Sequence, residues 1–157
     1  MKASVLRRIL NLWPPFLFAG IRVKALSADW RHASVRLKLA WYNRNYVRTH
    51  FGGSLFAMTD PFWMILVMHA LGRDYIVWDK SGVIDFLAPG REDVFAEFTV
   101  DQAVLDEIRE ATASGDKYLR WFDVDVTTAA GERIAQVRKQ LYIRRKRDRV
   151  PADAIEG

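Results

Sequence analysis

Apolar and polar residues alternate along several segments of the chain, and a period of two is typical of β-strands that bury one face. In "ASVRLKLA" (33–40) every second residue is apolar up to Leu39, and "VFAEFTV" (94–100) shows the same alternation. This pattern, extended to the remaining apolar segments, predicts six mainly antiparallel strands, over residues 21–28, 33–40, 75–90, 93–101, 117–128 and 133–145.

Two other segments have the composition of helices. Residues Gly53–Ala70 are apolar nearly all round, which predicts a central helix that other elements surround. Pro61 removes a backbone donor inside this helix and is expected to kink it. A second, amphipathic helix is expected over Gln102–Ala113, with Asp101 as its N-cap and Gly115 as its stop.

The order of elements predicts an α+β fold in which a curved, six-stranded antiparallel sheet wraps around the central helix. No repeat or long linker divides the chain, so residues 1–157 are expected to form one domain. Within it, residues 1–20 are predicted to be an N-terminal helical extension, and residues 144–157 a basic, flexible C-terminal tail.

Composition narrows the class of protein. Half of the 157 residues are hydrophobic, which argues for a globular protein, and no cysteine is present. The lack of cysteine excludes disulfides, thiolate nucleophiles and zinc–thiolate sites, and it fits a cytoplasmic location. The longest apolar run, Pro61–Leu71, is about half as long as the roughly 20 residues that span a bilayer, so no membrane span is expected.

The N-terminal segment loosely imitates a signal peptide, because basic residues precede an apolar run. That run is short and Pro14-Pro15 interrupts it, and no small-residue cleavage site follows. A short helix that packs back on the domain is therefore the preferred interpretation.

Asp60 is the most unusual residue of the central helix. A carboxylate among so many apolar side chains is expected to be buried, and an unpaired buried charge is costly. It could serve the structure by capping a helix or bonding to a loop. The alternative is a functional carboxylate that acts as a general base or a nucleophile.

The spacing around Gly52 resembles the signature of phenylacetyl-CoA-type thioesterases of the hotdog fold. That signature has Asn, five residues, His-Gly-Gly, and a catalytic Asp eight residues beyond the first glycine. Asn45 lies seven residues before Gly52, and Asp60 lies eight residues after it. The segment "FLAP" (86–89) also resembles the strand end of that family.

The chain resembles more closely an uncharacterised hotdog branch often labelled as tetrameric acyl-CoA thioesterases. The segments that carry this resemblance are "WPPFLFAGIRV", "NRNYVRTHFGGSLFAMTDPF", "DYIVWDK" and "LYIRRK". The chain departs from the phenylacetyl-type motif at one position, because Phe51 takes the place of the histidine and His50 precedes it.

The resemblance implies hydrolysis of an acyl-CoA thioester at a subunit interface of a homodimer or tetramer. Asp60 would activate water or attack directly, the Gly52 N–H would hold the carbonyl oxygen, and Asn45 would position the reactants. The expected substrate contacts are Gly53, Ser54, His50, Phe51, Asp79, Arg144 and Arg145. No metal and no cofactor are expected, apart from coenzyme A as part of the substrate.

Several alternatives stay open at this point. Gly52 and Gly53 could form a left-handed turn, Asn45 could be a turn residue, and Asp79 could simply pair with Lys80. The basic residues between 138 and 149 could be a solvated strand end, a site for coenzyme A phosphates, or a non-specific nucleic-acid contact. No recognition helix or stacking motif accompanies them, so no specific nucleic-acid partner is expected.

Two further expectations concern the ligand. An acyl tunnel is expected along bulky side chains near the central helix, which would favour medium, long or aromatic acyl groups over acetyl. Its predicted lining is Phe51, Phe56, Phe62, Trp63 and Met64. Because Phe51 replaces the motif histidine, a non-catalytic protein that binds acyl-CoA or an acyl carrier is the alternative function.

Overall fold

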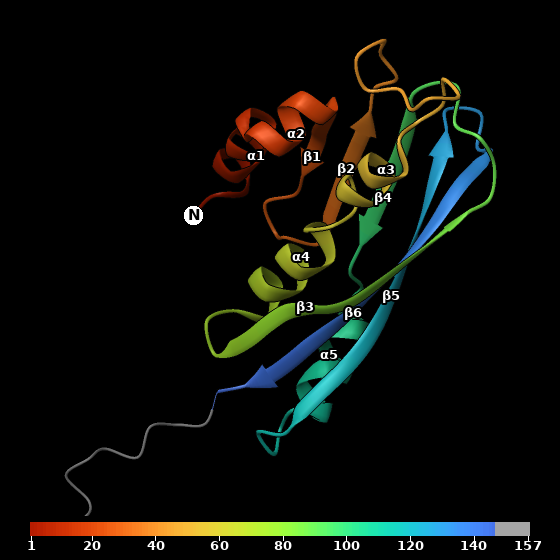
Figure 1. The fold of residues 1–157 in the computed structure, drawn as a ribbon. Helices are drawn as coiled ribbons and strands as arrows, with labels where there is room; N and C mark the ends of the chain where they lie inside the picture. Colours follow the sequence, from red (N-terminus) through yellow and green to blue (C-terminus); the bar gives the residue numbers. More distant parts are fainter. Residues whose placement is uncertain (147–157) are drawn as a thin grey trace, which may run out of the picture.

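The computed structural model describes residues 1–146, which form five helices and six strands (Figure 1). The helices are α1 (Ala3–Leu12), α2 (Pro14–Ala19), α3 (Gly52–Ala57), α4 (Phe62–Leu71) and α5 (Gln102–Ala111). The strands are β1 (Ile21–Leu26), β2 (His32–Leu37), β3 (Tyr75–Phe86), β4 (Val94–Thr99), β5 (Lys117–Thr128) and β6 (Arg133–Arg145).

The six strands form one antiparallel sheet in the order β1-β2-β4-β5-β6-β3. Figure 1 shows that the sheet is curved and that α3 and α4 lie in its hollow. The predicted α+β architecture is therefore confirmed. β1 and β3 are the two edge strands. Within residues 1–146, β3 pairs only with β6, so its other side is open over a long strand, Tyr75–Phe86.

Aromatic side chains hold α4 against the sheet. The Phe62 ring lies 5.1 Å from the Phe98 ring, and the Trp63 ring stacks on Phe122 at 5.0 Å. Phe62 is fully buried and Trp63 nearly so. The expectation that these two side chains line an acyl tunnel is wrong, because both are packed in the core.

The central helix is broken into two. The chain forms a turn over residues 58–61 between α3 and α4, where the sequence predicted one kinked helix. Pro61 has no N–H to continue α3, and its restricted φ suits the start of the next helix. Its carbonyl accepts from the Ile65 N–H at 2.9 Å, so α4 begins immediately after it.

The first twenty residues fold onto the sheet. Asn11 of α1 holds the backbone of Val23 through two hydrogen bonds, of 2.8 and 3.1 Å. Phe16 of α2 is buried with its ring 6.1 Å from that of Phe62. These contacts fix α1 and α2 beside the β1 edge (Figure 1).

One segment of the described chain, Gly52–Leu71, is long and apolar enough to cross a membrane by length and composition alone. Half of it is buried inside the protein, and the core helix of a globular protein has the same properties.

The second predicted helix begins after Asp101 as expected, but the Asp101 side chain makes no capping hydrogen bond and α5 ends at Ala111.

Candidate active site

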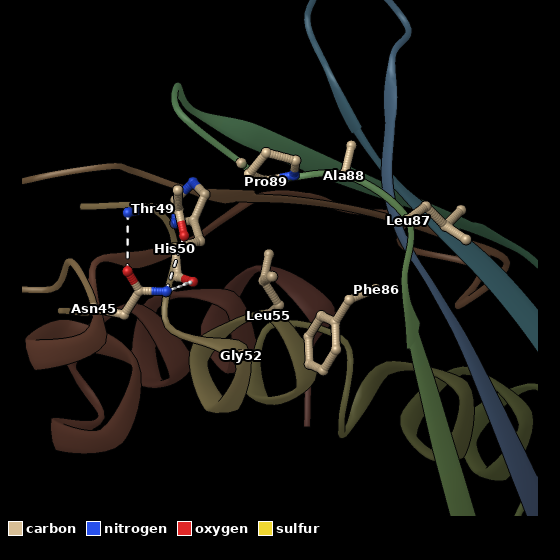
Figure 2. A pocket seen from close by; sticks show the side chains of 10 residues that line it. Asn45, Thr49, His50, Gly52, Leu55, Phe86, Leu87, Ala88 and Pro89 are labelled. Atoms are coloured by element: carbon tan, nitrogen blue, oxygen red, sulfur yellow. Dashed lines mark hydrogen bonds between the residues drawn. The ribbon is translucent and has the colours of Figure 1, made fainter. Parts of the chain in front are cut away.

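A pocket of about 420 Å³ lies between the loop that precedes α3 and the segment that follows β3 (Figure 2). The His50 N–H donates to the Gly90 carbonyl at 3.0 Å and so ties the two walls together. The "FLAP" segment therefore faces the Gly-Gly motif across one pocket. The lining residues are Asn45, Thr49, His50, Gly52, Leu55, Phe86, Leu87, Ala88, Pro89 and Gly90.

Aromatic rings lie over Gly52 and Gly53 and leave no room for a side chain at either position. A Cβ on Gly52 would come within 2.7 Å of Phe86 Cζ, and one on Gly53 would meet the Phe51 ring. Neither glycine has a positive φ, so the alternative of a left-handed turn at this position is wrong. Within residues 1–146, no acceptor receives the N–H of Gly52 or Gly53.

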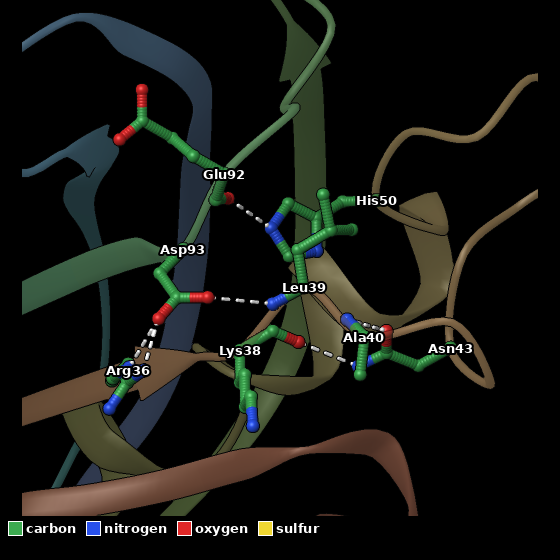
Figure 3. Close-up of polar contacts among 8 residues, drawn as sticks. All are labelled: Arg36, Lys38, Leu39, Ala40, Asn43, His50, Glu92 and Asp93. Carbon is green, nitrogen blue, oxygen red and sulfur yellow. Dashed lines mark hydrogen bonds and ion pairs between the residues drawn. The ribbon is translucent and has the colours of Figure 1, made fainter.

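His50 is buried in the pocket wall and is held in one orientation. Its Nε2 lies 2.7 Å from the Glu92 carbonyl oxygen, which can only accept, so Nε2 carries the proton (Figure 3). Burial lowers the pKa of His50, only partly opposed by the Glu92 carbonyl and Asp93, so the ring is neutral near pH 7. Nδ1 is then an acceptor, and it has no partner within the described residues.

The loop wall is fixed by Asp93 and Asn43 (Figure 3). Asp93 accepts from the Leu39 N–H at 2.9 Å and from Arg36, while Asn43 binds the Ala40 N–H and the carbonyl of Lys38. Burial alone would raise the pKa of Asp93, but the Leu39 and Arg36 hydrogen bonds outweigh it and hold the pKa below its ordinary value.

Both the Nδ2 and the Oδ1 of the Asn45 side chain form hydrogen bonds within the loop. Its Nδ2 donates to Thr49 Oγ1 at 2.9 Å and to the His50 carbonyl at 3.1 Å. Its Oδ1 accepts from the Val47 N–H and from the Thr49 N–H, the second of which is drawn in Figure 2. This geometry matches the turn alternative, in which Asn45 shapes the loop that carries His50 and Gly52.

Asp60 is not the buried, unpaired carboxylate that the sequence led us to expect. Its side chain is 52% exposed, and its Oδ1 accepts from Lys139 Nζ at 2.6 Å. The turn between α3 and α4 brings the carboxylate out to the surface of the protomer. An exposed, ion-paired carboxylate carries little desolvation cost, so Asp60 at this position does not destabilise the fold as a buried, unpaired charge would.

Lys139 is the functional candidate that the sequence analysis missed. Its side chain is only 4% exposed and lies between Asp60 and Asp79, whose Oδ1 is 3.7 Å away. It also stands over the Phe56 ring at 5.0 Å. The signal was present in β6, where the inward-facing positions read Ala135, Val137, Lys139, Leu141 and Ile143.

Asp79 belongs to this cluster. The expected pair with Lys80 is not among the ion pairs of residues 1–146, and its cation is Lys139. Burial raises the pKa of Asp79, and the negative charge of Asp60 adds to the rise, while Lys139 opposes it. Two carboxylates and one buried ammonium therefore share a small volume beside the edge strand.

The predicted site residues fall into three places. Asn45, His50, Gly52 and the neighbouring Gly53 and Ser54 are at the pocket, where the Ser54 N–H is occupied by the Phe51 carbonyl. Asp60 lies eight residues further on, beyond the end of α3 in the turn over residues 58–61. Asp60 does not line the pocket of its own protomer.

Arg144 and Arg145 lie at the far end of β6. Arg145 pairs with Tyr75, whereas Ala135, ten residues earlier, pairs with Phe86 at the pocket. At about 3.3 Å per residue this is a separation of about 30 Å within one protomer. The remainder of the predicted basic tail, from residue 147 on, lies outside the described residues. Within them, no three His, Asp or Glu side chains gather to hold a metal ion.

An antiparallel six-stranded sheet wrapped around a central helical segment is the hotdog fold, as the resemblance implied. The chain belongs to the family described as "Domain of unknown function (DUF4442)", whose model matches residues 2–143. No curated protein gives a significant match.

Solved structures share this fold at low sequence identity. A Pseudomonas aeruginosa protein of unknown function, named a "probable thioesterase", is 17% identical with a TM-score of 0.81, covering 92% of this chain and 97% of that one. A Chlorobaculum tepidum protein of unknown function is 15% identical, with a TM-score of 0.71 and coverages of 92% and 94%. A Haemophilus influenzae thioesterase is 13% identical, with a TM-score of 0.67 and 92% of each chain covered.

Proposed function

We propose that the protein hydrolyses an acyl-CoA thioester to a free acid and coenzyme A, without a metal ion. The observation that carries the proposal is the pair formed by the Gly52 N–H at a pocket and a surface carboxylate, Asp60, eight residues later. The first can stabilise an oxyanion, and the second can act as a base or nucleophile.

The two halves of this site meet if two protomers pair through β3. In one protomer Phe86 lies beside Gly52, Gly82 beside Phe56, and Asp79 beside the Lys139–Asp60 pair. A two-fold axis across the middle of β3, near Gly82, reverses the strand and sets the Asp60 end of one protomer against the Gly52 end of the other. Such pairing would also cover the long open edge.

Hydrolysis of the thioester in this site can follow either of two mechanisms. As a base, Asp60 takes a proton from a water molecule whose oxygen attacks the thioester carbon, and the C–S bond breaks to release a thiolate that takes up the proton. As a nucleophile, Asp60 attacks the carbon and the C–S bond breaks, which releases the thiolate and leaves a mixed anhydride. Water then hydrolyses the anhydride to the free acid and the Asp60 carboxylate, and the proton that water gives up goes to the thiolate. In both routes the Gly52 N–H donates to the developing oxyanion.

The pocket suggests the type of acyl group. Its wall includes the apolar side chains of Leu55, Phe86 and Leu87, and its volume of about 420 Å³ leaves room for more than an acetyl group. We therefore favour medium, long or aromatic acyl groups over acetyl. In the paired arrangement, Arg144 and Arg145 would serve the pocket of the second protomer, since they lie far from their own.

A thiol-release assay over a series of acyl-CoA chain lengths tests the proposal. Asp60→Asn keeps the size of the side chain but removes the base, so turnover should fall by a factor of about 10²–10⁴. Asp106→Asn on α5, which alters another exposed and ion-paired carboxylate away from β3, is the matched control and should stay active. A fully active Asp60→Asn protein would refute the role of Asp60.

A second candidate function is non-catalytic binding of acyl-CoA or an acyl carrier. It is favoured by Phe51, whose ring stands over Gly53 at the position of the motif histidine, and by Lys139, which already neutralises Asp60. In this case the wild-type protein and Asp60→Asn would bind acyl-CoA equally well in calorimetry, and neither would release thiol.

A further inference from the structure

The N-terminal helices expose an unusual amount of apolar side chain. On α1, Val5, Ile9 and Leu12 follow one another at i, i+4 and i+7 and form a stripe in solvent, apart from the buried Ala3 and Leu10. The stripe continues onto α2, where Phe18 is 75% exposed. We define the N-terminal face by the exposed side chains Val5, Ile9, Leu12, Trp13, Leu17 and Phe18.

The loop after β2 extends this face. Asn43 Nδ2 donates to the Ala19 carbonyl at 2.8 Å and so fastens the loop to the end of α2. Tyr42 and Leu17 line one shallow hollow, and the neighbouring Trp41 is 81% exposed. Large aromatic side chains from two separate segments therefore lie in solvent near the same end of the sheet.

The segment of the chain that forms this face is mainly basic. Residues 1–59 contain ten lysines and arginines and one acid, Asp29, whereas the remainder of the chain is net negative. Lys2 and Arg8 flank the α1 stripe, and Arg22 and Lys38 line the hollow beside Leu17. Apolar side chains ringed by basic ones favour a partner that is both apolar and anionic.

A bilayer with anionic lipids has both properties, since its phosphates attract lysine and arginine while its acyl region accepts leucine, phenylalanine and tryptophan. A symmetric contact with a second copy would instead bring two basic faces together. Nucleic acid would leave the aliphatic stripe of α1 without a partner. We propose that the N-terminal face docks the protein on the surface of an anionic membrane, independently of whether the pocket hydrolyses thioesters.

Vesicle flotation of the full-length protein tests this proposal. The wild-type protein should float with phosphatidylcholine vesicles that contain phosphatidylglycerol, and float poorly with phosphatidylcholine alone. The double variant Leu12→Ser, Phe18→Ser should lower the fraction bound by about tenfold or more, because it removes two side chains from the apolar contact. Both residues are exposed, so melting curves should show that the variant folds.

The matched control is Trp78→Ser, Trp121→Ser, which removes two exposed aromatic side chains from the outer face of the sheet. It should float like the wild type. The proposal is overturned if the wild type does not float with anionic vesicles, or if both double variants lose binding equally. It is also overturned if Leu12→Ser, Phe18→Ser changes the sedimentation of the protein instead of its flotation, or if duplex DNA displaces the wild type completely while the variant still floats.

Discussion

At the scale of single residues, the sequence singled out Gly52, Gly53 and Asp60, and the structure gives different physical reasons for these residue types at these positions. The glycines are needed by the rings of Phe86 and Phe51, which leave no room for a Cβ, and not by a left-handed backbone. Asp60 reaches the surface and meets Lys139, so it is not an isolated charge in the core. The spacing of residues along a chain does not show which side chains cover them.

The role of the Gly52 N–H can be tested by a pair of substitutions at that one position. Gly52→Pro removes the donor, and proline suits the first residue of a helix. Phe51 has a ψ of 127°, which is compatible with a following proline. Gly52→Ala adds the same Cβ but keeps the N–H. If the N–H binds the oxyanion, Gly52→Pro should have a kcat about 10²–10³ lower than Gly52→Ala.

Melting curves control for the shared Cβ, because both variants displace the exposed Phe86 ring and should fold alike. Equal kcat values for the two variants would remove the oxyanion role from Gly52. A lower melting temperature for Gly52→Pro alone would be corrected for by measuring both at a temperature where both are folded.

At the scale of elements, the alternation of apolar residues and the positions of turn residues and helix caps were sufficient to locate each strand of the sheet and α5 to within a few residues. Two features could not be read from local pattern. The break between α3 and α4 depends on how Pro61 is packed, and a kink and a full turn look the same in sequence. The Lys139 cluster depends on register, because β3, β6 and the helix break must align before Asp79, Lys139 and Asp60 come together.

This cluster predicts a pH dependence of stability. The pKa of Asp79 is raised above its ordinary 3.8, chiefly by burial, so the folded protein holds this proton more tightly than the unfolded chain. The resulting stability is present below pH 3.8 and is lost as the pH rises through the raised pKa. Asp79→Asn removes the titrating carboxyl and therefore the loss of stability at higher pH. The variant keeps Asp60, which pairs with Lys139 at 2.6 Å.

The Asp79→Asn protein should therefore melt at a higher temperature than the wild type at about pH 7, and this gain should vanish by about pH 3. Calorimetric melting over that pH range is the measurement. Asp106→Asn, on α5 and exposed, should show no such trend. A lower melting temperature for Asp79→Asn at neutral pH would mean that the ion pair with Lys139 outweighs the burial of Asp79.

At the scale of the whole molecule, the described protomer carries both halves of the proposed chemistry but keeps them apart. The pocket with Gly52 is at one end of the α3–β3 contact, and Asp60 is at the other, in the turn that follows α3. Pairing of β3 edges around Gly82 would join them across two protomers. No property of a single chain's sequence fixes this arrangement, because it is a relation between two copies.

Mixing two inactive proteins tests the shared site directly. Asp60→Asn keeps the Gly52 donor, and Gly52→Pro keeps Asp60, so a mixed dimer has one intact site and one site with both defects. If subunits exchange at random, half of the dimers are mixed, and thiol release should recover to about one quarter of the wild-type rate. Co-expression with two different affinity tags isolates the mixed dimer, whose rate should be about half that of the wild type. Sedimentation establishes that each protein is at least a dimer at the assay concentration. If the mixture stays as inactive as its components while subunit exchange is shown, Gly52 and Asp60 do not act on the same thioester across the β3 edge.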